Sequence, residues 1–557
     1  MQKRILLLFM GFVAGRTVAQ SIEEAQKFLY YDRLNSAETT VKQLIQKDAS
    51  NTEAYYWLFQ TELQLGDTVA ARQALDDVQK LEQSNPKLKT DPLVEAGRVQ
   101  LMLLDGKKTE AKAASEELVK KTKGKNAGVL RALAKAQVNA PQGEGDYDYA
   151  LTLIEQAIKR DKKEPENYLL MGDAWRRKGD GGQAVSSYQQ AIALDAGYAR
   201  ANYSIGKIYI TQQNSSAYLK HFLDAIQQDA NFSPAYYELY YHFYYRDVNE
   251  AKKYLEKFIA TADKTVENDY MMTDLLYVSS KNKEAIEMAN RLLREQGEKA
   301  KPRLYKLIAA SYDALGDSVK ALSYMDTYFE KERPENYIAK DYATRADLLI
   351  KVKDSAGREQ AIEQWEKAIA LDTLEANKID YMHQVATNYK KMGNRSKEAY
   401  WLGNIASTKK DPTNLDIYYW GLAHYAAGEY KMADSVFSIY INKYPEQVHG
   451  YLWRAKSNAV IDSTMENGLA VPYYTKVIEI ADDDAKTNKS LLIQAYGYIG
   501  AYEANVEKDY PDALEHFKKI LELDPNNSDA SRYSEILQKW INAADSAKST
   551  SEAGTDN

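Results

Sequence analysis

The chain has 557 residues, 45% of them hydrophobic and 27% charged, which is typical of a folded protein. It contains no cysteine, which excludes disulfides, thiolate metal sites, a thiol nucleophile and a lipid-modified N-terminal cysteine. The formal net charge is -7 and no basic stripe occurs, so nucleic acid is not an expected partner. With only six histidines, we expect no metal site and no cofactor.

Residues 1–19 are typical of a signal peptide. The basic residues Lys3 and Arg4 precede an apolar stretch (5–15) and a small-x-small site that ends at Ala19. The stretch is about half the ~20 residues of a membrane-spanning helix. Removal of residues 1–19 deletes three basic residues and no acid, which changes the net charge from -7 to -10. We therefore expect a periplasmic protein without an integral membrane segment, at most peripheral to the outer membrane; the alternative is an ordinary first helix.

One small residue recurs along the rest of the chain at intervals of 33 to 43 residues. Thirteen of the fourteen positions are alanine and one is tyrosine. In chain order the fourteen are Ala37, Ala71, Ala111, Ala150, Ala184, Tyr218, Ala251, Ala285, Ala321, Ala361, Ala399, Ala433, Ala470 and Ala513. The most complete copy, residues 165–198, adds Tyr168, Gly172, Trp175, Gly179-Asp180 and Tyr188 around Ala184. Small residues let two helices approach closely, large aromatics fill the space between units, and Gly-Asp makes a tight turn that caps the next helix.

This pattern resembles the tetratricopeptide repeat, in which each unit is a pair of antiparallel helices. The resemblance covers roughly residues 21–527 and implies an all-α solenoid of about fourteen helix pairs, with a right-handed superhelix expected from the family. We expect a signal peptide at 1–19, an N-terminal array at 20–300, a C-terminal array at 301–527, a capping helix at 528–543 and a disordered tail at 544–557.

No catalytic motif emerges from the sequence. No histidine lies in a His-Glu-x-x-His frame, and no glycine-rich phosphate loop with a following Lys-Ser/Thr occurs. The acidic run at Asp482, Asp483 and Asp484 lacks the ligand spacing of a calcium loop and is better explained as a solvated linker. We therefore expect a protein that is not an enzyme.

Tyrosine is over-represented, at 44 of 557 residues. In tetratricopeptide arrays the first helix of each pair lines the concave face, so the register implies which side chains face inward. The resemblance implies a ligand-binding groove formed by Tyr203, Lys207, Tyr237, Tyr241, Tyr244, Tyr245, Tyr270, Asp274 and Tyr277. Tyrosine offers a flat apolar face and one hydroxyl at low entropic cost, which suits peptide segments and sugar rings alike.

Two further considerations bear on this groove. The alternative is that tyrosine only fills repeat cores, as expected at Tyr168, Tyr188, Tyr305 and Tyr440. The register also argues against the chaperone-binding subclass, whose clamp places asparagine on the first helix. The corresponding positions here hold Asp173, Lys207, Tyr241 and Asp274.

A second motif is Asp-Ser/Thr followed by a small or aliphatic residue, which is similar to an O-glycosylation sequon of exported proteins in some Gram-negative bacteria. The candidate acceptors are Thr68, Ser318, Ser355, Thr373, Ser435, Ser463 and Ser546. Helix capping is the alternative at Asp67 and Asp317, which precede expected second helices. It does not account for the copies in loops or in the tail.

The sequence thus predicts a non-enzymatic periplasmic scaffold that binds a protein or peptide segment in a tyrosine-rich concave groove, as part of an envelope complex. The alternative is a cell-envelope polysaccharide assembly or export factor whose tyrosines stack on sugar rings. An enzyme is the third hypothesis.

Overall fold

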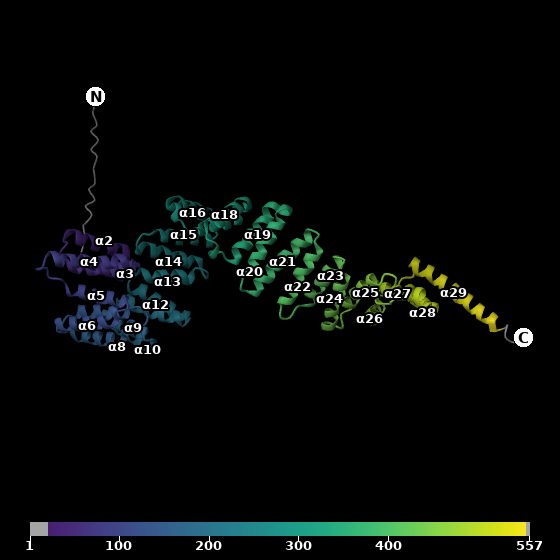
Figure 1. Cartoon of the computed structure of the whole chain (residues 1–557), viewed down its shortest axis with the longest axis horizontal. Helices are drawn as coiled ribbons and strands as arrows, with labels where there is room; N and C mark the ends of the chain where they lie inside the picture. The colour runs from purple at the N-terminus through teal and green to yellow at the C-terminus, as the bar shows by residue number, and fades with distance from the viewer. Residues whose placement is uncertain (1–20, 553–557) are drawn as a thin grey trace, which may run out of the picture. The chain divides into compact units, whose positions relative to one another are not determined.

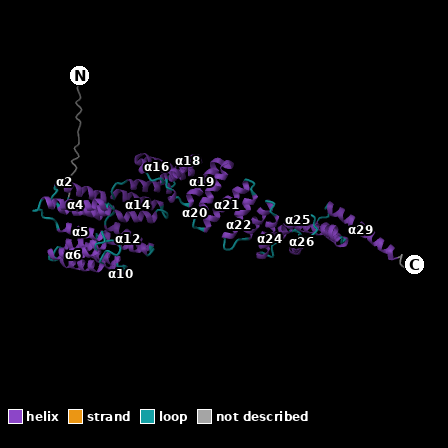
Figure 2. Ribbon diagram, viewed as in Figure 1, coloured by secondary structure: helices purple, strands orange, loops and turns teal. Residues whose placement is uncertain are grey.

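The computed structural model describes residues 21–552; the predicted signal peptide at 1–19 lies outside them. The described chain contains 29 α-helices and no strand (Figure 2). Helices α1 to α28 form fourteen consecutive pairs, and α29 follows as a single helix, which confirms the predicted all-α helix-pair solenoid with a final capping helix. The chain divides into two compact units, one ending at Lys299 and one beginning at Ala300.

The N-terminal unit holds the first eight pairs (Figure 1). Its helices are α1 (Ile22–Tyr30), α2 (Leu34–Lys47), α3 (Thr52–Leu65), α4 (Thr68–Ser84), α5 (Pro92–Leu104), α6 (Lys108–Lys121), α7 (Ala127–Val138), α8 (Tyr147–Arg160), α9 (Pro165–Arg177), α10 (Gly181–Leu194), α11 (Ala199–Thr211), α12 (Ser215–Gln228), α13 (Ser233–Phe243), α14 (Val248–Thr261), α15 (Val266–Val278) and α16 (Asn282–Gln296).

The C-terminal unit holds the remaining helices, which are α17 (Arg303–Ala314), α18 (Ser318–Lys331), α19 (Ala339–Lys353), α20 (Arg358–Leu371), α21 (Glu375–Lys391), α22 (Arg395–Thr408), α23 (Asn414–Ala426), α24 (Tyr430–Lys443), α25 (Val448–Ile461), α26 (Val471–Ala481), α27 (Lys489–Tyr502), α28 (Tyr510–Leu523) and α29 (Ser528–Glu552). The last helix covers α28 through ring contacts of Tyr533 with Phe517 and of Trp540 with Tyr510. It continues past 543, so residues 544–552 are helical and the expected tail at 544–557 is corrected over that part.

The repeated small residues are the points where paired helices meet. All thirteen repeat alanines are fully buried, each with 0% exposure. The one repeat position that is not alanine, Tyr218, is half-buried, and its hydroxyl lies 2.8 Å from Nδ1 of His242. A larger side chain at this position in α12 therefore points along the helix surface toward α13, while the alanines allow close contact.

Glycine takes the matching role on the first helix of several pairs. A Cβ atom on Gly172 of α9 would lie 2.4 Å from the ring of Tyr188 on α10. The same substitution at Gly206 of α11 would place it 2.5 Å from Phe222 on α12. Both rings are completely buried, so they have no room to move aside.

The predicted Gly-Asp turns are present between the helices of a pair. Gly179 has a φ of 87°, and the next residue, Asp180, caps α10 by accepting from the backbone N–H of Gln183 at 2.9 Å. Gly316 and Asp317 repeat this arrangement before α18. The left-handed glycine ends one helix and the aspartate begins the next.

The N-terminal unit is closed by a contact between its first helix pair and its sixth to eighth pairs. We call residues 30–36, the turn between α1 and α2, the clasp. Ser233 at the start of α13 donates to the carbonyl of Tyr31 at 2.6 Å, and the Tyr31 hydroxyl donates to Asp229 at 2.7 Å. These partners are about 200 residues apart in the sequence, so the contact joins the two ends of this unit.

Two charged groups from distant repeats cap the helix ends that meet in the clasp. Arg200 on α11 donates to the carbonyls of Leu29 and Tyr30 at the end of α1 and to Asp32 at 2.7 Å. A cation at the C-terminus of a helix is stabilised by the helix dipole. The guanidinium also lies 5.4 Å from the centre of the Tyr30 ring and 5.6 Å from that of Phe232.

Asp263, in the loop before α15, caps the beginning of α2. Its Oδ2 accepts from the backbone N–H groups of Asn35 at 2.8 Å and Ser36 at 3.1 Å. Its Oδ1 accepts from Arg33 at 3.3 Å. The side chain of Arg33, the N-cap residue of α2, makes no capping hydrogen bond. The carboxylate of Asp263 therefore takes the place of a local cap.

We predict that Gly172→Ala destabilises the α9–α10 pair by about 1–3 kcal/mol, because the added methyl group overlaps the buried Tyr188 ring. Amide hydrogen exchange of α9 and α10 measures the effect. The control is Gly182→Ala on α10, where the nearest atom to an added Cβ is 3.5 Å away and alanine favours the helix. Equal protection in both variants would contradict the close approach.

We also predict that Asp263→Ala loosens the clasp, because α2 loses its N-terminal acceptor at a cost of roughly 0.5–2 kcal/mol. Amide exchange at Asn35 and Ser36 should become several-fold faster. Asp247→Ala is the matched control, since Asp247 caps α14 in the same way through Asn249 and Glu250. If Asp247→Ala accelerated exchange at residues 34–36 as much as Asp263→Ala does, the clasp would not depend on Asp263.

Candidate functional site

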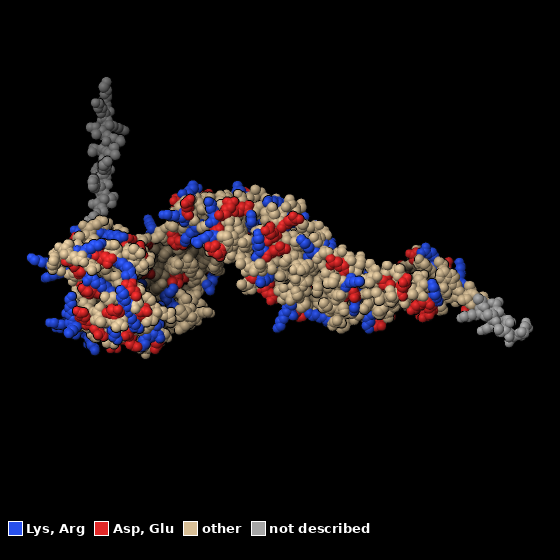
Figure 3. All heavy atoms as spheres, viewed as in Figure 1, with Lys and Arg blue, Asp and Glu red and all other residues tan. Residues whose placement is uncertain are grey.

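The predicted groove residues lie on the first helices of the sixth, seventh and eighth pairs, α11, α13 and α15, and in the turn after α13. Figure 3 shows the N-terminal unit hollowed on the face drawn, and the wall of this hollow carries mostly residues other than Lys, Arg, Asp and Glu. Of the nine predicted residues, four tyrosines are exposed, four residues (Tyr203, Lys207, Tyr244 and Asp274) are half-buried, and Tyr270 is buried.

Tyr237 and Tyr241 on α13 form the centre of the exposed surface. They are 39% and 49% exposed, and their rings meet edge to face with centroids 4.8 Å apart. Tyr237 also contacts Phe258 of α14 at 5.4 Å. Burial raises the pKa of Tyr241, and the hydrogen bond with Tyr237 and the nearby carboxylates Glu267 and Asp274 raise it further. The two rings therefore hold one another in place while their outer faces remain open.

Tyr277 and Tyr245 are also exposed, at 37% and 87%. Tyr277 lies on α15, and Tyr245 follows the end of α13. Tyr244, the C-cap residue of α13, is half-buried between the rings of Tyr240 at 5.5 Å and Tyr245 at 4.6 Å. We call Tyr237, Tyr241, Tyr245 and Tyr277 the tyrosine face.

Tyr203 and Lys207 on α11 are held by Glu238 of α13. Lys207 donates to Oε1 of Glu238 at 2.7 Å, and the Tyr203 hydroxyl lies 3.5 Å from the same oxygen. The Tyr203 ring packs on Phe222 and Phe232, with centroids 5.7 and 5.6 Å away. Burial raises the pKa of Tyr203, with Glu238 contributing. Both residues thus join α11 to α13.

Tyr270 is a core residue, which corrects its assignment to the groove. It is 1% exposed and lies on α15 with the buried residues Asn268, Met271 and Leu275. Asp274 on the same helix is half-buried and close enough to Tyr241 to influence its pKa. The residues at 270, 274 and 277 are spaced to share one helix face, but the inner edge of that face is covered by neighbouring helices.

The tyrosines expected to fill repeat cores divide by degree of burial. Tyr188 and Tyr440 are buried, at 0% and 3% exposure, and Tyr168 and Tyr305 are half-buried. Tyr188 donates to Asp173 at 2.7 Å, and burial raises the pKa of that carboxyl. Core filling therefore accounts for these positions and does not account for the tyrosine face.

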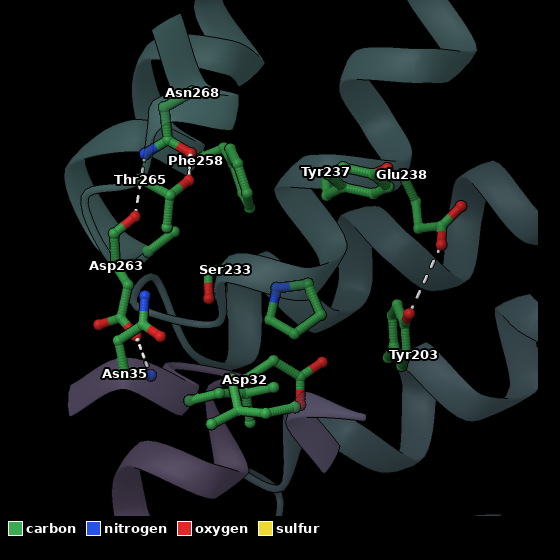
Figure 4. A pocket seen from close by; sticks show the side chains of 14 residues that line it. Asp32, Asn35, Tyr203, Ser233, Tyr237, Glu238, Phe258, Asp263, Thr265 and Asn268 are labelled. Atoms are coloured by element: carbon green, nitrogen blue, oxygen red, sulfur yellow. Dashed lines mark hydrogen bonds between the residues drawn. The ribbon is translucent and has the colours of Figure 1, made fainter. Parts of the chain in front are cut away.

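A cavity of about 410 Å³ opens between the clasp and helices α11, α13 and α14 (Figure 4). Its apolar wall includes Leu34, Tyr237 and Phe258, and its carboxylates are Asp32, Glu238 and Asp263. Asp32 has a φ of 55°, in the left-handed region that few non-glycine residues adopt. The contribution of the clasp to this cavity was not predicted from the sequence, because no local pattern relates residues 30–36 to residues 200–268.

The candidate glycosylation hydroxyls lie in different settings. Thr68, Ser355, Thr373, Ser435, Ser463 and Ser546 are exposed, and Ser318 is half-buried with its hydroxyl 3.1 Å from Asp313. Asp67 and Asp317 cap α4 and α18, as the capping alternative expects. Ser435 and Ser546 lie within helices, and Ser355, Thr373 and Ser463 lie between α-helices. Glycosylation of these residues stays a prediction.

Within residues 21–552, no group of three or more His, Asp and Glu side chains is arranged to hold a metal ion. In the same described part of the chain, no helix combines the length and the apolar character needed to cross a membrane.

Comparison with known proteins places the chain in a family. A sequence model described as tetratricopeptide repeat matches residues 135–199. The C-terminal part of a TPR repeat-containing protein from Cytophaga hutchinsonii is 30% identical, covering 47% of this chain and 98% of that one, with a TM-score of 0.32. No curated protein matches the chain.

Two other solved structures match part of this chain. A tetratricopeptide repeat protein from Parabacteroides merdae is 18% identical over 47% of this chain and 98% of its own, with a TM-score of 0.31. A protective antigen of uropathogenic Escherichia coli with an SLR fold is 16% identical over 76% of this chain and 90% of its own, with a TM-score of 0.38. The chain belongs to the tetratricopeptide repeat family, because the repeat model matches it, the Cytophaga hutchinsonii protein is 30% identical to it, and its described part forms fourteen helix pairs.

Proposed function

We propose that the protein is a non-enzymatic scaffold of the periplasm that holds a segment of a partner protein against the tyrosine face. Membership of the tetratricopeptide repeat family implies a scaffold for protein–protein interactions. The observation that carries the finer proposal is the exposure of Tyr237 and Tyr241, which no repeat-core requirement explains. Exposed apolar patches rimmed by polar groups are typical of interaction sites.

The chemistry of the tyrosine face suits a peptide. Each ring has only two side-chain torsions, so little entropy is lost when a partner orders it. The edge-to-face contact of Tyr237 and Tyr241 orients the rings before binding. The hydroxyls supply hydrogen bonds at the rim, which gives direction to an otherwise apolar contact.

The double variant Tyr241→Ala/Tyr277→Ala should lose partner binding, because interface tyrosines each contribute roughly 2 kcal/mol or more when they are central. We would place a photo-crosslinking amino acid at 237 in the native and variant proteins, irradiate cells and identify adducts by mass spectrometry. Discrete adducts are expected with the native face, and a loss of at least about tenfold with the double variant.

Tyr400→Ala/Tyr419→Ala is the matched control, since these tyrosines of the C-terminal unit are 62% and 53% exposed. Equal loss in the control, or undiminished adducts in the Tyr241/Tyr277 variant, would contradict the assignment. A glycan array tests the polysaccharide alternative with the same variants. Glycan binding that depends on Tyr241, without protein adducts, would favour that alternative.

Export is the second part of the proposal and is supported by the composition of residues 1–19. In cell fractions the protein should be periplasmic and should begin at Gln20. Ala19→Asp should block processing and leave a longer precursor, because the cleavage site requires a small residue. Cytoplasmic protein that still begins at Met1 would contradict export without affecting the tyrosine face.

A further inference from the structure

The cavity at the clasp combines aromatic walls with hydrogen-bond acceptors. Tyr237 and Phe258 lie on one side, and Asp32 reaches in from the clasp on the other (Figure 4). Leu34, Leu65, Pro234 and Ala262 complete the apolar part of the lining. The volume of about 410 Å³ is sufficient for one long side chain rather than for a folded element.

The charged side chains that line this cavity are all acidic. Three carboxylates, Asp32, Glu238 and Asp263, line it, and no Lys, Arg or His does. Each carboxylate has a cationic partner outside the lining, namely Arg200, Lys207 and Arg33 respectively. These partners orient the carboxylates without entering the cavity.

Two of the carboxylates retain accepting capacity. The contacts of Asp32 with Arg200 and of Glu238 with Lys207 and Tyr203 use one oxygen of each group, Oδ1 and Oε1. An ionised carboxylate has about four acceptor positions, so the second oxygens can accept from a ligand. Asp263 differs, because both of its oxygens already bind the clasp.

We infer that this cavity binds the cationic side chain of an arginine or lysine in the partner segment. The ammonium or guanidinium group donates to Asp32 and Glu238, and the aromatic faces of Tyr237 and Phe258 attract the positive charge. The aliphatic stem covers Leu34 and Leu65. The inference deepens the proposed function and rests on it for the origin of the side chain.

Binding in this cavity is coupled to closure of the N-terminal unit. The wall is formed jointly by the clasp, through Asp32 and Leu34, and by the loop and helices around Tyr237 and Phe258. A ligand that contacts both sides binds only the closed unit, so it stabilises closure by mass action. Amide exchange in the clasp therefore reports on occupancy.

The test uses Nα-acetyl-arginine amide as the probe and its neutral isostere Nα-acetyl-citrulline amide as the comparison, both measured by ligand-observed NMR on the full chain. Arginine amide should bind saturably and citrulline amide about tenfold more weakly, since a charge-assisted hydrogen bond is lost. Saturating arginine amide should slow exchange at residues 30–36, and the same concentration of citrulline amide should not.

Glu238→Gln should weaken arginine amide binding about tenfold, whereas the control Glu250→Gln, at a helix start outside the cavity, should leave it unchanged. Tyr237→Leu, which keeps the apolar wall and removes the ring, provides a second variant if Glu238→Gln alters the pairing of α11 with α13. Equal binding of the two amides, or unchanged affinity in both cavity variants, would overturn the inference.

No partner protein is needed for these measurements, so their failure is distinct from failure of the scaffold proposal. If arginine amide binds but no adducts form at the tyrosine face, the inference about the cavity stands and the scaffold proposal fails. If adducts form but arginine amide does not bind, the scaffold proposal stands and the inference about the cavity fails.

Discussion

The structure depends on the close approach of the two helices in each repeat. Alanine at the second helix and, in several pairs, glycine at the first leave room for buried rings such as Tyr188 and Phe222, whose edges would overlap even one added methyl group. This constraint orients each pair in the same way relative to the next. As a result, the first helices of the sixth to eighth pairs present Tyr203, Tyr237 and Tyr277 on neighbouring elements.

The second determinant is electrostatic and acts over a long sequence distance. Arg200 and Asp263 complement the opposite dipoles at the end of α1 and the beginning of α2, so the turn between these helices is stabilised by partners from other repeats. A repeat array ordinarily has contacts only between neighbours. The clasp adds a contact between distant repeats, which borders a cavity in the N-terminal unit.

The candidate site combines these two features. The repeat geometry supplies exposed aromatic rings on α13 and α15, and the clasp places the carboxylate of Asp32 across the cavity from Tyr237. An apolar face with hydroxyls and an acceptor-lined cavity are adjacent and share Tyr237. The proposed partner segment, with both apolar and basic side chains, rests on this arrangement.

The amino-acid sequence by itself determined the repeat, the helix pairs, the Gly-Asp turns and the terminal helix, because these follow from local spacing and from residue size at Ala184, Gly172 and their equivalents. Its repeat register also singled out the exposed residues Tyr237, Tyr241, Tyr245 and Tyr277, but not Tyr400 and Tyr419, which are exposed in the C-terminal unit. Only the tertiary structure decided that Tyr270 is buried, that Tyr203 and Lys207 are held by Glu238, and that Asp32 lines a cavity. Those outcomes depend on the curvature that brings residue 30 to residue 200, and no pattern within one repeat contains that information.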